Sequence, residues 1–75
     1  MAENEPAYKM VEDGLVTVKQ ASEFLNISIA GVYAAMGRGE LAYVKLGRSR
    51  RVPRRALAEL AAKNLVVRDQ RHPAW

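Results

Sequence analysis

Cysteine is absent from this chain of 75 residues, which excludes both a disulfide framework and a thiolate metal site. The single histidine, His72, has no obvious companion ligands, so we expect neither a bound metal nor a cofactor. A chain this short forms one domain at most, and its core must be small. Freedom from cysteine is typical of proteins in a reducing compartment, and we expect a cytoplasmic location.

Long apolar runs and clusters of catalytic residue types are also missing. No apolar stretch approaches the roughly 20 residues that cross a bilayer, and the N-terminal sequence MAENEPAYK is acidic where a signal peptide would be basic. With one histidine, no cysteine and no carboxylate pair beside a nucleophile, the sequence argues against an enzyme. We expect no membrane contact and no small-molecule substrate.

What the chain does have is a strong asymmetry of charge within its net charge of +4. Residues 1–24 carry five acidic side chains against two lysines, whereas residues 36–55 carry six arginines and one lysine against a single glutamate. Basic charge gathered in one part of a small domain is typical of nucleic-acid binding. A solvated surface face would give the same composition.

Two short helices joined by a tight turn are predicted in the first half of the chain. Residues 1–13 show no periodicity and are expected to form a flexible N-terminal arm. Thr17 and Ser28 are each well placed as helix N-caps, and Asn26 should end the first helix. The apolar positions recur at helical spacings, as Val18, Ala21, Phe24 and Leu25 in the first helix and Ile29, Val32, Tyr33 and Met36 in the second.

A β-hairpin and a third helix are predicted to follow. Strands at 42–46 and 49–52 flank a turn at Gly47-Arg48. Pro53 lacks an N–H and fixes φ, so it can only end a strand or begin a helix. The third helix should therefore begin at Pro53 and run to about Asn64.

The predicted order is helix, turn, helix, two-stranded wing and helix. This is a mainly α fold with a small β-hairpin, a winged helix-turn-helix domain over residues 14–64, followed by a C-terminal tail over 65–75. Seven apolar side chains are expected in its core: Phe24, Leu25, Val32, Leu41, Val44, Leu57 and Leu60.

Three stretches together resemble the excisionase-type helix-turn-helix family, small winged-helix domains related to the DNA-binding part of the MerR regulators. They are VTVKQASEFLNIS, then VY followed by RGEL, then KLGRSRRVPRRAL, and the resemblance covers residues 15–60. It implies double-stranded DNA as the partner and a place on the nucleoid, with the second helix in the major groove and the wing over the backbone. Some members are recombination directionality factors that assist an integrase in excising a mobile element, and others are regulators of transcription.

Residue by residue, the resemblance places DNA contacts on the second helix, its exit and the wing. The implied DNA-binding residues are Ser28, Ala30, Gly31, Tyr33, Arg38, Lys45, Arg48, Ser49, Arg50 and Arg51. The chain departs from the family where relatives carry polar or basic side chains after the capping serine, because it has Ile29, Ala30, Gly31 and Ala34 instead.

The chemistry of these residues predicts strong phosphate contact and weak base reading. Ala30 and Ala34 can touch a thymine methyl but offer no donor or acceptor to a base edge, and Gly31 would allow close backbone approach. The cations of the wing, with Arg54 and Arg55, can hold phosphates, which makes binding steeply salt-dependent. Selectivity would then come from neighbouring copies, from DNA bending or from a partner such as an integrase.

Several alternatives stay open at this stage. Tyr33 and Met36 are expected to lie in the core rather than to contact DNA. For Ile29, the helical spacing predicts a buried side chain, whereas the family pattern predicts an exposed one. If Ile29 is exposed, it forms an apolar patch with Ala30 and Ala34, and a protein-interaction module becomes an alternative. RNA binding is less favoured because Tyr43 is the only aromatic side chain near the wing.

Overall fold

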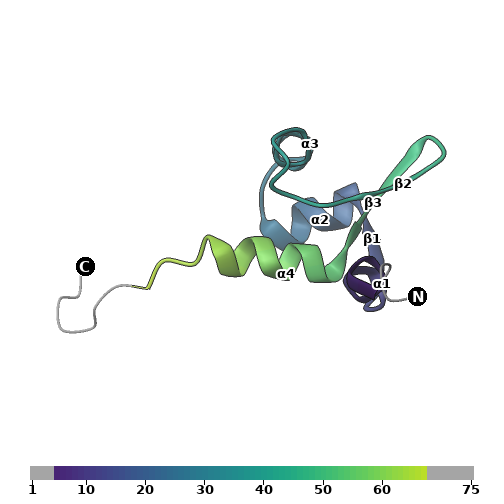
Figure 1. Cartoon of the computed structure of the whole chain (residues 1–75). Coiled ribbons are helices and arrows are strands. Elements are labelled where there is room, and N and C mark those ends of the chain that lie inside the picture. The colour runs from purple at the N-terminus through teal and green to yellow at the C-terminus, as the bar shows by residue number, and fades with distance from the viewer. Residues whose placement is uncertain (1–4, 68–75) are drawn as a thin grey trace.

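The computed structural model describes residues 5–67 and has four helices and three strands in that range (Figure 1). A three-stranded antiparallel sheet has the order β1-β3-β2 and is packed against the helices. This confirms the mainly α, winged helix-turn-helix fold. The elements in chain order are α1 (Glu5–Val11), β1 (Leu15–Thr17), α2 (Val18–Leu25), α3 (Ile29–Gly37), β2 (Val44–Leu46), β3 (Ser49–Pro53) and α4 (Arg54–Lys63).

The helix-turn-helix is formed by α2 and α3, and local capping chemistry fixes its boundaries. The Thr17 hydroxyl accepts from the Gln20 N–H at 3.0 Å, and the Gln20 side chain accepts from the Thr17 N–H at 2.9 Å, which is a complete capping box. Asn26 ends α2 in the left-handed region at φ 55°. Ser28 then caps α3, as predicted.

The sheet contains a strand that the sequence analysis missed. The central strand β3 pairs with β2 through Lys45 opposite Arg50, and with β1 through Val16 opposite Val52. The predicted hairpin is confirmed, and its turn begins at Gly47, whose φ of 61° favours glycine. β1 has only three residues and leads directly into α2, which left no alternation to detect in the sequence.

The prediction of an arm over residues 1–13 needs correction, because residues 5–11 form helix α1. α1 lies against α4, with Met10 packed on the core and the Lys9 carbonyl accepting from Arg55 Nη1 at 3.5 Å. This single apolar anchor gives no repeating signal in the sequence. Within residues 5–67 no helix has the length and apolar character that a bilayer span requires.

The core lies between the sheet and helices α2, α3 and α4, and three of the expected core assignments were wrong. Val44 is only half-buried and is not part of the core. Phe24 is 60% exposed and Tyr33 is 45% exposed. In α2 the inward stripe runs through Val18, Ala21, Ser22 and Leu25, so Phe24 falls beside it; in α3 it runs through Val32, Ala35 and Met36. The small Ala21 and Ala35 are both buried, in two helices that pack against each other.

Candidate nucleic-acid interface

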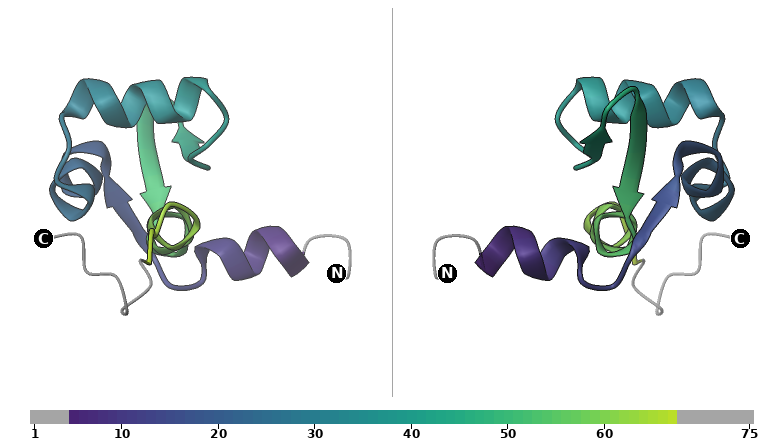
Figure 2. Two further views of the ribbon diagram at one scale, coloured as in Figure 1. Left: turned by 90° about the vertical axis from the view of Figure 1, so that its left-hand side faces the viewer. Right: turned by 90° about the vertical axis from the view of Figure 1, so that its right-hand side faces the viewer.

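Helix α3 and the wing, formed by β2, β3 and the Gly47-Arg48 turn, lie on the same side of the molecule. Figure 1 shows α3 and the tip of the wing in the upper part of the view and α4 and α1 in the lower part, and the two views of Figure 2 also show α3 at the top and α4 and α1 below. A helix and a protruding hairpin on one surface form the arrangement in which winged helices contact a duplex. This surface is therefore the candidate nucleic-acid interface.

The outward face of α3 is formed by Ile29, Ala30, Tyr33 and Ala34, all exposed, and we call it the α3 face. Ile29 is 46% exposed, which settles the position that periodicity left open. No residue from Ile29 to Gly37 carries a charged or amide side chain, so the Tyr33 hydroxyl is the single polar group of the face. The face offers apolar contact and almost no hydrogen bonding.

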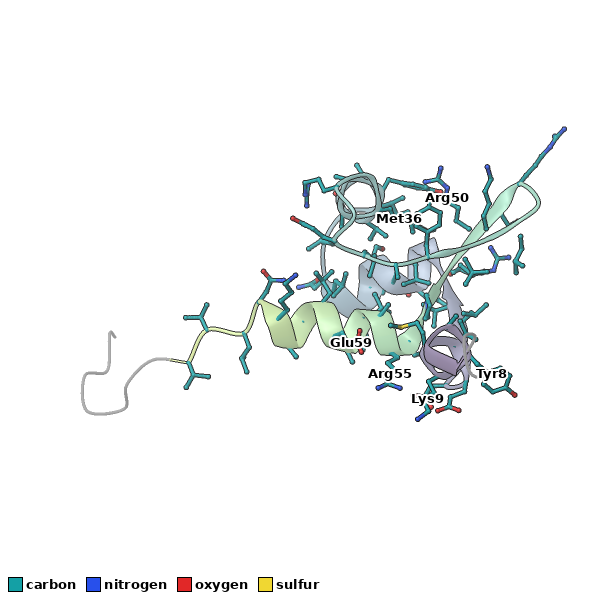
Figure 3. The ribbon with its side chains drawn as sticks, in the orientation of Figure 1. Tyr8, Lys9, Met36, Arg50, Arg55 and Glu59 are labelled. Atoms are coloured by element: carbon teal, nitrogen blue, oxygen red, sulfur yellow. The ribbon has the colours of Figure 1, made fainter. Side chains whose placement is uncertain are left out.

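Arg50 connects the wing to α3. Its guanidinium lies 5.4 Å from the ring centroid of Tyr33 and 4.9 Å from that of Tyr43, and its Nη1 is 3.9 Å from the Met36 sulfur (Figure 3). Each cation–π contact at an exposed site contributes about 0.5–1 kcal/mol. Arg50 is thus held in place before any ligand arrives, and its contact with Tyr33 explains why that tyrosine lies on the surface.

The register of the wing separates the other predicted cations. Lys45 is paired with Arg50 across β2 and β3, so both side chains lie on the α3 side of the sheet. Arg51 follows Arg50 in the strand and points to the opposite face, where its Nη1 donates to the Arg50 carbonyl at 3.0 Å. Arg48 and Ser49 are exposed at the tip. Arg51 is therefore separated from the other predicted wing contacts.

Ser28 and Gly31, both predicted contacts, are engaged at the start of α3. The Ser28 hydroxyl accepts from the Gly31 N–H at 3.0 Å, and its own proton remains able to donate. A Cβ at Gly31 would lie 3.3 Å from Ile27 Cδ1 and 3.4 Å from the Ser28 hydroxyl oxygen. Packing against Ile27 and Ser28 therefore also favours glycine here, and the close approach of the Gly31 backbone to a ligand stays a prediction.

Arg38 caps the C-terminal end of α3 and forms an ion pair with Glu40, with Nη2 and Oε1 2.9 Å apart. The hydrogen bond, and then the charge, of Arg38 lower the pKa of Glu40, while the same pair raises the pKa of Arg38. Both side chains are exposed, so the pair contributes little to folding. Glu40 nevertheless offsets part of the positive charge that Arg38 would present to a phosphate.

Arg54 and Arg55 lie at the far end of β3, in the first turn of α4. Arg55 Nε lies 3.4 Å from a carboxylate oxygen of Glu59, one turn further along the helix, and Figure 3 shows Arg55 beside α1 with Arg50 on the opposite side. An internal partner, rather than an external anion, thus accounts for the charge of Arg55. That Arg54 and Arg55 join the wing in holding phosphates stays a prediction, and the structure places Arg55 away from Arg50.

A family model described as a helix-turn-helix domain matches residues 15–65, which span both helices, the sheet and α4. The chain belongs to this helix-turn-helix family. A curated relative from Saccharopolyspora erythraea, described as "Probable excisionase", is 39% identical over 49 residues, covering 65% of this chain and 50% of the relative. The chain thus spans about half the length of that relative. Together the two matches confirm the excisionase-type resemblance, and no solved structure matches.

Beyond the helix-turn-helix surface, a hollow lies between α2 and α4. It has a volume of about 240 Å³ and is lined by Val16, Gln20, Phe24, Arg54 and Leu57. The exposed Phe24 ring is explained by its place at this hollow. No pattern in the sequence indicates the hollow, because it forms only where two helices and β1 meet.

Proposed function

We propose that this chain binds double-stranded DNA, with α3 lying in the major groove and the wing holding the sugar-phosphate backbone beside it. The observation that carries the proposal is the position of Arg50. The Arg50 guanidinium contacts the rings of Tyr33 and Tyr43, so the charged hairpin and the outward face of α3 lie side by side on one surface. A major groove about 12 Å wide accepts an α-helix, and phosphates border it on both sides.

Four cations border the α3 face and are available to phosphates. Lys45 and Arg50 share one side of the wing, Arg48 is at its tip, and Arg38 is at the end of α3. If Lys45, Arg48 and Arg50 each neutralise one phosphate, log K should fall with log salt at a slope of about −2.7, since each contact contributes about −0.9. The slope reaches about −3.6 if Arg38, which is paired with Glu40, neutralises a fourth. The Ser28 hydroxyl proton adds an uncharged donor at the other end of α3.

The biological role we propose is that of an excision accessory factor, acting with an integrase on the DNA of a mobile element. The similarity to a protein described as a probable excisionase supports this role. A small regulator of transcription would use the same domain, and we keep it as the second candidate. Neighbouring copies bound side by side would add to the weak selectivity of a single α3 face.

Two measurements test DNA binding and the biological role separately. Retention of a random-sequence duplex at low salt, lost at higher salt, tests DNA binding itself; absence of retention at low salt would contradict it. Recombination between the element's attachment sites, with the neighbouring integrase and with or without this chain, tests the role. Excision that depends on the chain supports the accessory factor, whereas excision unaffected by it, with footprints at a promoter, supports the regulator.

A further inference from the structure

The α3 face is unlike the rest of the candidate interface because it is apolar and exposed. We propose that this face reads the 5-methyl groups of thymine, so that the domain prefers thymine-bearing major grooves over grooves of the same charge without methyls. The inference rests on the proposed DNA binding and specifies what α3 recognises there.

The donor and acceptor inventory of the face supports this inference. Guanine, cytosine and adenine present hydrogen-bonding groups in the major groove, and proteins read them with arginine, asparagine, glutamine or carboxylate side chains. None of these residue types occurs in α3. Thymine also presents a methyl group there, and apolar side chains are the ones that contact it. Ile29, Ala30 and Ala34 can therefore discriminate thymine, and the face has no comparable means of discriminating guanine or cytosine.

Burial supplies the driving force for such contacts. Ile29 and Tyr33 are 46% and 45% exposed, so a sizeable part of both side chains remains in water in the unbound protein. Covering this surface with thymine methyls removes apolar area from water on both partners. A guanine or cytosine edge in the same place would lose hydration and could gain only the Tyr33 hydroxyl as a partner from the face.

Charge complementarity identifies DNA, rather than a second copy of the chain, as the occupant. Arg38 lies at the end of α3, while Arg50 and Lys45 lie along its flank on the wing. Two α3 faces packed together would bring these cations against their own copies, which is unfavourable. An apolar strip bordered by cations instead matches the methyl-bearing floor of a major groove bordered by phosphates.

The test compares duplexes that differ only in methyl groups. Affinity is measured by fluorescence anisotropy for alternating adenine–thymine and adenine–uracil duplexes, and for alternating guanine–cytosine and guanine–5-methylcytosine duplexes. Base pairing and backbone charge are kept within each pair. We expect about a fourfold loss for each contacted methyl that uracil removes, from the transfer free energy of one buried methylene, and a gain where 5-methylcytosine adds one.

A matched pair of variants assigns the effect to the α3 face. Ala30→Ser with Ala34→Ser should lower the thymine-to-uracil affinity ratio, while Ala58→Ser with Ala62→Ser on the exposed side of α4 should leave it unchanged. Equal affinity for the methylated and unmethylated duplexes would overturn the inference and leave DNA binding intact. A wild-type chain that retains none of the duplexes at low salt would overturn the proposed function as well. If the α3 variants keep the ratio but change self-association in sedimentation, the face is a protein interface and the inference is wrong.

Discussion

The wing carries four cations and no acidic residue between Val44 and Pro53, whereas α3, on the same surface, carries no charged side chain at all. A charged hairpin acts over a long range and without regard to sequence, because it interacts with phosphates. An apolar helix face acts only at contact. The difference implies that the wing supplies most of the affinity for DNA, while α3 supplies shape complementarity and base selectivity. Arg50 lies between the two regions and contacts both.

The largest effect should follow from removing the wing charges. Replacing Lys45, Arg48 and Arg50 together by glutamine should reduce the salt slope of DNA binding by about 2.7 and the affinity at about 0.1 M salt by two to three orders of magnitude. The matched control replaces Lys9, Arg54 and Arg55 by glutamine, which removes the same charge from α1 and the start of α4. Salt titrations of DNA binding measure both variants. Similar losses of affinity in the two variants would show that the wing is no more important for DNA binding than the start of α4 and α1.

A carboxylate placed on the α3 face should have the next largest effect. Ala34→Glu should weaken DNA binding about 30-fold, or about 2 kcal/mol. This value lies between the repulsion energies of two like charges about 4 Å apart in water, about 1 kcal/mol, and near a protein surface, about 4 kcal/mol. Ala58→Glu, at an exposed position of α4, is the control and should change affinity little. Thermal unfolding should show both variants within about 0.5 kcal/mol of the wild type. Unchanged DNA affinity of the Ala34→Glu variant would show that α3 does not lie in the groove.

The contact between the two regions can be weakened without changing the charge. Arg50→Lys keeps the cation but loses the planar group that lies over Tyr33 and Tyr43, and we expect about a fivefold loss of affinity, equal to about 1 kcal/mol. Arg48→Lys, at the wing tip without such rings, should change affinity by about twofold or less. Anisotropy titrations at one salt concentration distinguish these outcomes, and equal losses would show that Arg50 acts through its charge alone.

Features of the two regions that local interactions determine could be predicted from the sequence, whereas features that depend on contacts between distant residues could not. The caps at Thr17 and Ser28 and the Gly47 turn were predictable because their chemistry is local. The outward direction of α3 was not, because nearly every residue in it is small or apolar and periodicity cannot choose a face.

The arrangement of the wing charges depended on long-range pairing. That Arg50 lies on the α3 side while Arg51 does not follows from the β2–β3 register and the position of Tyr33. Strand β1 is recognisable only by its pairing with β3, and α1 only by its packing on α4. The run of arginines therefore predicted a cationic wing but not which of its members act together.

The smallest expected effect concerns the end of α3. Glu40→Gln should release Arg38 and strengthen DNA binding about two- to threefold, with the salt slope steeper by at most about 0.9. Because Arg38 lowers the pKa of Glu40, the wild-type carboxylate stays ionised until the pH falls below the ordinary pKa of a glutamate side chain. Only below that pH should protonation of Glu40 have the same effect as Glu40→Gln. Glu59→Gln, which releases Arg55 instead, is the control. No gain from Glu40→Gln would show that Arg38 does not reach a phosphate.

The measurement that tests the central claim most directly is a map of backbone amide chemical shifts as a short duplex is added to the labelled chain. Changes should concentrate from Ser28 to Ala34 and from Lys45 to Arg50, while amides of α1 and of α4 from Ala56 onward move little. Changes concentrated on α1 and α4, with α3 and the wing unaffected, would contradict the claim that these two regions form one DNA-binding surface.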